Sequence, residues 1–202
     1  TMLGKGLRGV PRDRYLLSTK VGKTTVGKVF DDRFDFTRQG ILRSLDESLK
    51  RLGVDHVAIV HLHDIEYEGG RHLEAALGEG LDTLRELKRE GRIRAISVGT
   101  YPVDLLRRLL AMDAFDTALI HNHYCLNDTQ LLDLLPIAKQ HGVGIINASP
   151  FAMGLLSDRE PPAWHPASPE EKQLLRDVAE FCRQQGTFIN KLAPQFASQH
   201  PD

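Results

Sequence analysis

Residues 41–63, ILRSLDESLKRLGVDHVAIVHLH, combine a helix and a strand in the order that decides the fold. Leucine or isoleucine recurs at helical spacing from Ile41 to Leu52, and Gly53 follows where a helix commonly ends in a left-handed turn. The run that begins at His56 is short and almost continuously apolar, which is typical of a strand covered on both faces of a sheet. A helix that leads into a buried strand indicates a parallel α/β sheet.

The same alternation continues along the rest of the chain. The predicted strands are 15–21, 56–63, 93–99, 117–124 and 143–149. The predicted helices are 41–52, 73–90, 102–112, 129–141 and 168–185, with a further helix starting at Asn190. Strands joined by helices pair in parallel with right-handed crossovers. About five strand–helix units are fewer than the eight of a closed (β/α)8 barrel, so the pattern predicts part of such a barrel or a small open doubly wound sheet.

Composition narrows the class of protein. A chain of 202 residues with 41% hydrophobic residues can bury one substantial core, so we expect a single domain over 1–202. A formal net charge of −1 argues against nucleic acid as the main partner, because phosphate neutralisation needs an excess of Lys and Arg. No apolar stretch reaches membrane-span length and no signal peptide is evident, so we expect a cytoplasmic protein. Cys125 and Cys182 are expected to be reduced thiols.

Two strand ends carry side chains suited to catalysis. Lys20 lies at the end of the first predicted strand, where partial desolvation would suit it to acid–base chemistry or, alternatively, where it would form a salt bridge at the rim. His61 and His63 lie two apart on the next strand and therefore share a face. His63 is nearer the end of that strand and favours a functional role, whereas His61 is expected to be a buried core histidine.

Two later strand ends carry further polar groups. His121 and His123 form a second His-x-His pair near the end of the fourth strand. Ser149 and Pro150 end the fifth, and the turn continues to Gly154. A turn of this kind leaves a hydroxyl and backbone N–H groups where a phosphate could rest.

Four segments of this sequence resemble one enzyme family. They are STKVG at 18–22, SLDESLKRLGVDHVAIVHLHDIEY at 44–67, LLDLLPIAKQHGVGIINASPFAMGLL at 131–156 and PPAWHPASPE at 161–170. Together, and in this order, they are similar to the aldo-keto reductases, in particular to their sugar dehydrogenases. The resemblance implies a (β/α)8 TIM-type barrel, represented here by about strands three to seven, that binds NAD or NADP across its C-terminal mouth. It also implies hydride transfer between the nicotinamide and an aldose or a small aldehyde or alcohol.

The resemblance also implies roles for individual residues. Lys20 matches the lysine that makes a catalytic tyrosine more acidic, and His63 matches the histidine that orients the substrate oxygen. The cofactor is expected to contact Thr100, His121, Ser149, Pro150, Gly154 and Leu155, with no metal ion. The family's catalytic Asp and Tyr are expected upstream of the region that matches Thr1, and its eighth strand beyond Asp202.

Two other functions remain open from the residues. A metal-dependent hydrolase could use the two His-x-His pairs, with Lys20 bridging metals if carbamylated. A truncated, non-catalytic barrel remnant would instead present exposed strand edges.

Overall fold

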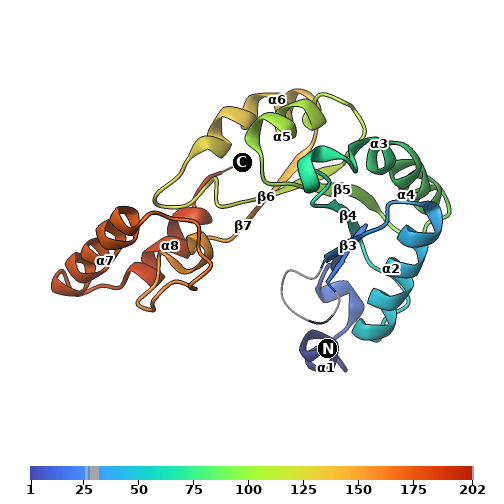
Figure 1. Ribbon diagram of the computed structural model, residues 1–202. Helices are drawn as coiled ribbons and strands as arrows, with labels where there is room; N and C mark the ends of the chain where they lie inside the picture. The colour runs from blue at the N-terminus through green and yellow to red at the C-terminus, as the bar shows by residue number, and fades with distance from the viewer. Residues whose placement is uncertain (26, 28–31, 202) are drawn as a thin grey trace. The chain divides into compact units, whose positions relative to one another are not determined.

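The computed structural model describes residues 1–25, 27 and 32–201 and shows an α/β fold of parallel strands and helices (Figure 1). The larger sheet contains, in spatial order, β1 (Ser18–Val21), β4 (Ile59–His63), β5 (Ala95–Gly99), β6 (Thr117–His121) and β7 (Gly144–Ala148). Each of these strands overlaps one predicted from the sequence. Their spatial order follows the chain without the reversal that defines a doubly wound sheet, so they form part of a barrel wall.

The remaining elements are helices, short helical turns and one hairpin. The α-helices are α1 (Met2–Gly6), α2 (Arg38–Leu52), α3 (Leu73–Ala75), α4 (Leu81–Arg89), α5 (Val103–Leu110), α6 (Leu135–Gln140), α7 (Pro169–Gln184) and α8 (Ile189–Ala197). The helical turns are η1 (Arg12–Arg14), η2 (Glu68–Gly70), η3 (Ala76–Gly80), η4 (Gln130–Leu134) and η5 (Ala152–Gly154). The hairpin pairs β2 (Lys23–Thr25) with β3 (Asp32–Phe34) in antiparallel orientation.

The chain divides into two compact units, each of which has its own core. The first contains Thr1–Leu119 and Ala138–Gly144, and the second contains Ile120–Ile137 and Ile145–Asp202. A single domain over 1–202 stays a prediction. Among the described residues, no helix is long and apolar enough to cross a membrane.

The strand register of the first unit separates an apolar face from a polar one. Val21, Leu62, Val98 and Ala118 are register partners across β1, β4, β5 and β6, and all four are fully buried. Helices α2, α3 and α4 lie along β4 and β5 in Figure 1. The next row of partners, whose side chains point to the opposite face, is polar and consists of Lys20, His61, Ser97 and Thr117.

Two helices differ from the sequence prediction in informative ways. The helix predicted over 73–90 is interrupted by the π-helical turn η3, because Gly78 leaves helical geometry with φ −91° and ψ −105°. The helix predicted over 129–141 begins as the 3-10 turn η4. By contrast α2 ends as predicted, since Gly53 adopts a left-handed conformation with φ 73°.

The second unit contains a small apolar core under α7 and α8. Ser168 caps α7, because its Oγ accepts a hydrogen bond of 3.1 Å from the Glu171 N–H group. The core residues are Cys125, Ala152, Leu155, Leu156, Leu175, Ala179, Cys182, Ile189 and Ala193. Both cysteines are buried and free, as the sequence predicts.

Gly22 joins β1 to the unpredicted hairpin and offers a test of local packing. It has φ +90°, and a Cβ atom there would lie 2.1 Å from Cε1 of the buried Phe36 ring. Gly53 has a similar φ of +73°, but a Cβ atom there would meet nothing within 4 Å.

We expect Gly22→Ala to lower the free energy of unfolding by roughly 2–4 kcal/mol, because it adds overpacking to backbone strain. Gly53→Ala adds the strain alone and is expected to cost about 1 kcal/mol. Urea unfolding followed by circular dichroism measures both values. Equal losses for the two variants would contradict the role assigned to the Phe36 contact.

Candidate active site

The C-terminal strand ends of the first unit bring Lys20 and His63 to one open hollow. This hollow has a volume of about 460 Å³. Its walls include Lys20 of β1, Lys23 of β2 and His63 of β4. The structure therefore brings together the two residues predicted to be catalytic. The expectation that Lys20 is partly desolvated is wrong, because its side chain is exposed in this structure.

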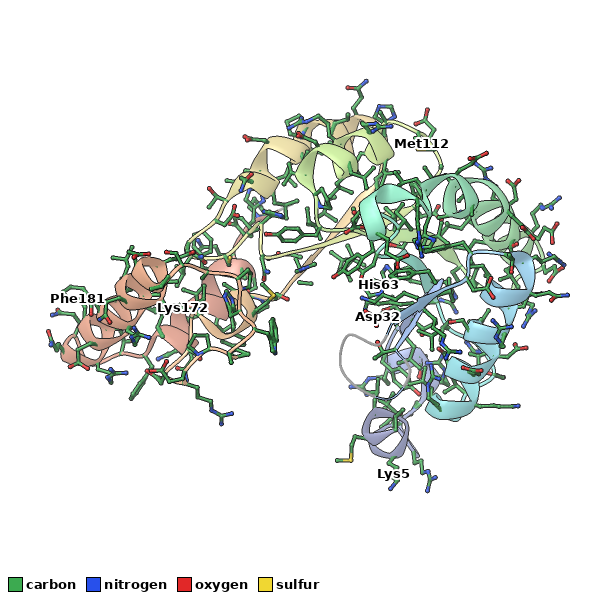
Figure 2. All side chains as sticks on the ribbon, viewed as in Figure 1. Lys5, Asp32, His63, Met112, Lys172 and Phe181 are labelled. Atoms are coloured by element: carbon green, nitrogen blue, oxygen red, sulfur yellow. The ribbon has the colours of Figure 1, made fainter. Side chains whose placement is uncertain are left out.

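His63 is held between a glycine and a carboxylate. Gly99 is its register partner on β5, and a Cβ atom at position 99 would lie 3.3 Å from Cδ2 of the imidazole ring. The ring lies next to Asp64, whose Oδ1 is 3.2 Å from Nε2. Figure 2 labels His63 and Asp32, a second carboxylate of the same unit. The absence of a side chain at Gly99 leaves room for the ring.

Lys23 links the hairpin to the strand end. Its Nζ lies 2.7 Å from Oδ2 of Asp64 and 3.1 Å from Oδ2 of Asp32, and it lies over the Tyr67 ring at 4.3 Å from the centroid. Burial acts to lower the pKa of Lys23, but the hydrogen bonds to Asp64 and Asp32 outweigh burial and raise it above its usual value. A hydrogen bond from Thr25, followed by that from Lys23, holds the pKa of Asp32 below its usual value. Lys23 is therefore a fixed cation.

His61 lies one layer deeper than His63. Its side chain is 1% exposed, and Nδ1 lies 2.7 Å from Oγ of Ser97, its register partner. Its Nε2 is buried without a hydrogen-bond partner in the structure. Burial, followed by the nearby charges of Lys20 and His63, lowers the pKa of His61 from 6.5 to about 4. The predicted core histidine is confirmed as buried, but only one of its nitrogens is satisfied.

Thr100 follows β5 and presents a buried hydroxyl. Its side chain is 1% exposed, and its backbone N–H donates to the Leu119 carbonyl at 3.2 Å. Its Oγ1 has no hydrogen-bond partner in the structure. Since a buried hydroxyl without a partner is costly, this atom is suited to bind a polar ligand.

The second unit contains the other residues predicted to contact the cofactor. His121 ends β6, and Asn122 follows in a left-handed conformation with φ 65°. Asn122 donates its backbone N–H to the Ala148 carbonyl at 3.3 Å, whereas its Oδ1 is buried without a partner in the structure. His123 instead pairs with Asp128, with 3.0 Å between Nδ1 and Oδ2. His123 is therefore held by a carboxylate of its own unit.

The turn after β7 is tightly closed on itself. Ser149 has φ 60°, and the backbone N–H groups of Ala152, Gly154 and Leu155 donate to carbonyls within the segment at 2.9, 2.9 and 3.2 Å. The expectation that such a turn offers its amides to a phosphate is therefore wrong for these three groups. Contacts of Ser149, Pro150, Gly154 and Leu155 with a cofactor stay a prediction.

A buried histidine that the sequence did not single out supports this turn. His165 accepts a hydrogen bond at Nδ1 from the Ala167 N–H, 3.1 Å away, so its proton lies on Nε2. Nε2 donates to the Ala152 carbonyl at 3.1 Å. Through these two hydrogen bonds, the 161–170 segment stabilises the turn after β7. The signal for it in the sequence was a histidine directly before Pro166 in a proline-rich, loop-like stretch.

Metal binding receives no support from the geometry. Within residues 1–25, 27 and 32–201, no group of three His, Cys, Asp or Glu side chains could hold an ion. His61 and His63 belong to the first unit, whereas His121 and His123 belong to the second.

Comparison with known proteins places the chain among reductases and dehydrogenases. The sequence model of the Aldo/keto reductase family matches residues 1–202. L-galactose dehydrogenase from Arabidopsis thaliana is 42% identical over 201 residues, which cover 97% of this chain and 60% of the relative. D-threo-aldose 1-dehydrogenase from Pseudomonas sp is 31% identical, with 98% of this chain and 66% of the relative covered. The chain thus spans less than two thirds of the length of these relatives.

Solved structures agree on the fold. A putative aldo-keto reductase from Pseudomonas aeruginosa is 32% identical with a TM-score of 0.60, over 74% of this chain and 55% of that one. An aldo-keto reductase from Bacillus halodurans has a TM-score of 0.69 at 22% identity, over 99% of this chain and 72% of that one. The predicted TIM-type barrel, of which this chain covers a part, is confirmed.

The depressed pKa of His61 predicts acid sensitivity. Between pH 6.5 and about 4 the unfolded chain binds a proton at this ring that the folded chain does not, so stability falls as the pH falls through that window. We expect a loss of about 2–3 kcal/mol across it. His61→Asn, which can still bond Ser97, should flatten the dependence of the urea midpoint on pH, whereas His56→Gln should not. An unchanged slope in His61→Asn would contradict this assignment.

Proposed function

We propose that this chain, which belongs to the aldo/keto reductase family, supplies the wall and two catalytic residues of an NAD- or NADP-dependent dehydrogenase that acts on an aldose or a small aldehyde or alcohol. The observation that carries the proposal is that Lys20 and His63, at the C-terminal ends of the neighbouring strands β1 and β4, line one hollow of about 460 Å³. In barrels of this type the chemistry takes place at this end of the strands.

We assign different catalytic roles to Lys20 and His63. The phenol of a tyrosine has a pKa near 10, and a lysine ammonium beside it favours the phenolate, so the phenol can exchange a proton with the substrate near neutral pH. We assign that cationic role to Lys20, an exposed residue that lines the hollow. The family's tyrosine has no match among the tyrosines of this sequence. We assign to His63 the donation of a hydrogen bond to the substrate oxygen, which stabilises negative charge there.

One buried polar atom in each unit, taken separately, supports the proposal of a nicotinamide cofactor. The cofactor, when bound, gives or takes the hydride. Thr100 Oγ1 in the first unit and Asn122 Oδ1 in the second are buried polar atoms that lack a partner in the structure, and both lie directly after strands. A carboxamide or a ribose hydroxyl could satisfy such atoms. We propose that Thr100, His121 and Ser149 contact the cofactor, with Pro150, Gly154 and Leu155 shaping the turn beside it.

An aldose is the substrate class we favour. The relatives described above are named for L-galactose and D-threo-aldose, and D-arabinose 1-dehydrogenase from Saccharomyces cerevisiae is 30% identical over 199 residues, covering 93% of this chain and 56% of that relative. A cytoplasmic location and the lack of a nucleic-acid partner stay predictions. No specific observation favours the metal-dependent hydrolase or the non-catalytic remnant.

We expect the intact protein to bind NAD or NADP and to quench Trp164, which is 54% exposed, in a saturable manner. Thr100→Val should weaken this binding by up to about tenfold, the value of one hydrogen bond. Thr117→Val is a matched control, because its Oγ1 is also buried without a partner but lies at the start of β6. Equal weakening by both variants would contradict a cofactor contact at Thr100.

Measurement of kcat tests the catalytic roles proposed for Lys20 and His63. In the intact protein, Lys20→Met and His63→Ala should each reduce kcat for aldose oxidation by about 10²- to 10⁴-fold. Lys50→Met, an exposed lysine of α2, should leave kcat unchanged. The absorbance of the reduced nicotinamide follows the reaction. Failure of every aldose and aldehyde tested to support turnover in the unmodified protein would overturn the proposed function.

A further inference from the structure

A second hollow lies at the N-terminal ends of the strands of the first unit, opposite the candidate active site. It has a volume of about 220 Å³. Its walls come from the segments that precede three neighbouring strands, with Leu16 before β1, Ala58 before β4 and Arg94 before β5. Arg12 of the helical turn η1 completes the set that matters here. The proposed dehydrogenase reaction makes no use of this hollow, because its residues lie at the other ends of the strands.

Backbone hydrogen bonds hold the walls of this hollow together. The Ala58 N–H group donates to the Leu17 carbonyl at 2.8 Å, which joins the segment before β4 to the segment before β1. The Ala58 carbonyl accepts from the N–H groups of Arg94 and Ala95 at 2.9 and 3.0 Å, which joins it to the start of β5. The hollow is therefore preformed, and a ligand would have little backbone to order on binding.

Two contacts fix the guanidinium group of Arg12 in this wall. Its Nη2 donates to the His56 carbonyl at 3.2 Å. Its Cζ atom lies 4.7 Å from the centroid of the Tyr15 ring, so the ring face covers one side of the cation. Neither contact supplies a negative charge. The guanidinium is therefore held in place by neutral groups and keeps its full positive charge, since arginine does not lose its proton in proteins.

Two of the three guanidinium nitrogens of Arg12 lack an acceptor. Nε and Nη1 are both buried, and neither has a hydrogen-bond partner in the structure. A buried donor without an acceptor is costly, and the cost is larger when the donor belongs to a charged group. A ligand that brings oxygen acceptors to Arg12 would remove this cost, so the protein gains more from binding an anion here than at an exposed arginine.

The balance of charge around the hollow also favours an anion. Arg94 is a second guanidinium on its lining and is exposed. Of the described residues that line the hollow, one is a carboxylate, the exposed Asp13. The nearby carboxylate of Asp55 is engaged elsewhere, because its Oδ1 lies 2.6 Å from Nδ1 of His56. Two permanent positive charges therefore face one negative charge on the lining.

We propose that this hollow binds a phosphate group, as inorganic phosphate or as the phosphate of a small organic ester, with Arg12 as the main ligand and Arg94 as a second cation. Nε and Nη1 of Arg12 and the head group of Arg94 together call for three or more acceptors, which a phosphate supplies and a carboxylate does not. A volume of about 220 Å³ is several times the roughly 30 Å³ that one water molecule takes up, so the group fits. The proposal does not depend on the dehydrogenase function.

The experiment titrates the intact protein with sodium phosphate at constant ionic strength. Excess NAD is present throughout, so that phosphate is kept from a cofactor site. The Nε–H signal of Arg12, assigned by its loss in Arg12→Gln, is followed by ¹H–¹⁵N NMR, and the dissociation constant is measured by calorimetry. We expect a saturable shift of this signal with phosphate and none with sodium chloride.

Three variants locate the site. Arg12→Gln should weaken phosphate binding by about tenfold to hundredfold, the value of a hydrogen bond to a charged group. Arg94→Gln should weaken it by about two- to fivefold, because an exposed charge contributes less. Arg14→Gln is the matched control: Arg14 is an exposed arginine of the same turn and does not line the hollow, so binding should be unchanged. Since Arg94 is exposed, its replacement tests the site even if Arg12→Gln lowers stability.

Different anions distinguish the sources of the phosphate group. Tighter binding of glucose 6-phosphate than of inorganic phosphate would identify an ester as the ligand, whereas equal affinity would identify the phosphate group alone, and both results support the site. Acetate that binds as tightly as phosphate and equally depends on Arg12 would overturn the assignment to phosphate. Absence of a saturable shift, or equal losses of affinity in Arg12→Gln and Arg14→Gln, would overturn the site itself.

Discussion

The parallel register of β1, β4, β5 and β6 is the constraint on which the rest of the structure depends. It aligns Val21, Leu62, Val98 and Ala118 in one buried apolar row, so the helices have a continuous surface to cover. The same register places the polar residues of the opposite face beside one another. Because a shift of one residue would exchange the two faces, the burial of the apolar row also fixes where the polar groups lie. Core packing thus determines the geometry of the candidate active site.

Much of this fold could be predicted from local sequence pattern. Each strand of the larger sheet overlaps a short, largely apolar run of the sequence, and the C-terminal end of α2 follows from Gly53 alone. The interruption at Gly78 and the β2–β3 hairpin could not be predicted in the same way. A glycine inside a helical pattern has no single outcome, and a hairpin of such short strands depends on partners elsewhere in the chain. These features are decided by packing rather than by periodicity.

The candidate site likewise combines features that could be predicted from the sequence with features that could not. The positions of Lys20 and His63 follow from strand-end placement, and family resemblance supplies their roles. The contacts of Asp64 with Lys23 and of His165 with Ala152 join residues far apart in sequence, so no spacing rule reveals them. The exposure of Lys20 was also not predictable, because it depends on what covers the edge strand of the sheet. Sequence therefore identified which residue types matter but not how they are held.

The strand ends share one backbone feature that bears on how this protein can vary. The residue directly after four strands of the larger sheet has a positive φ, namely Gly22, Asp64, Asn122 and Ser149. Only a few amino acids tolerate that conformation, and β-branched ones are excluded in practice. In a directed-evolution library aimed at new substrates, random substitution at these four positions would mostly yield poorly folded variants. Variation is better directed to exposed positions with negative φ, where the backbone does not limit the choice of amino acid in this way.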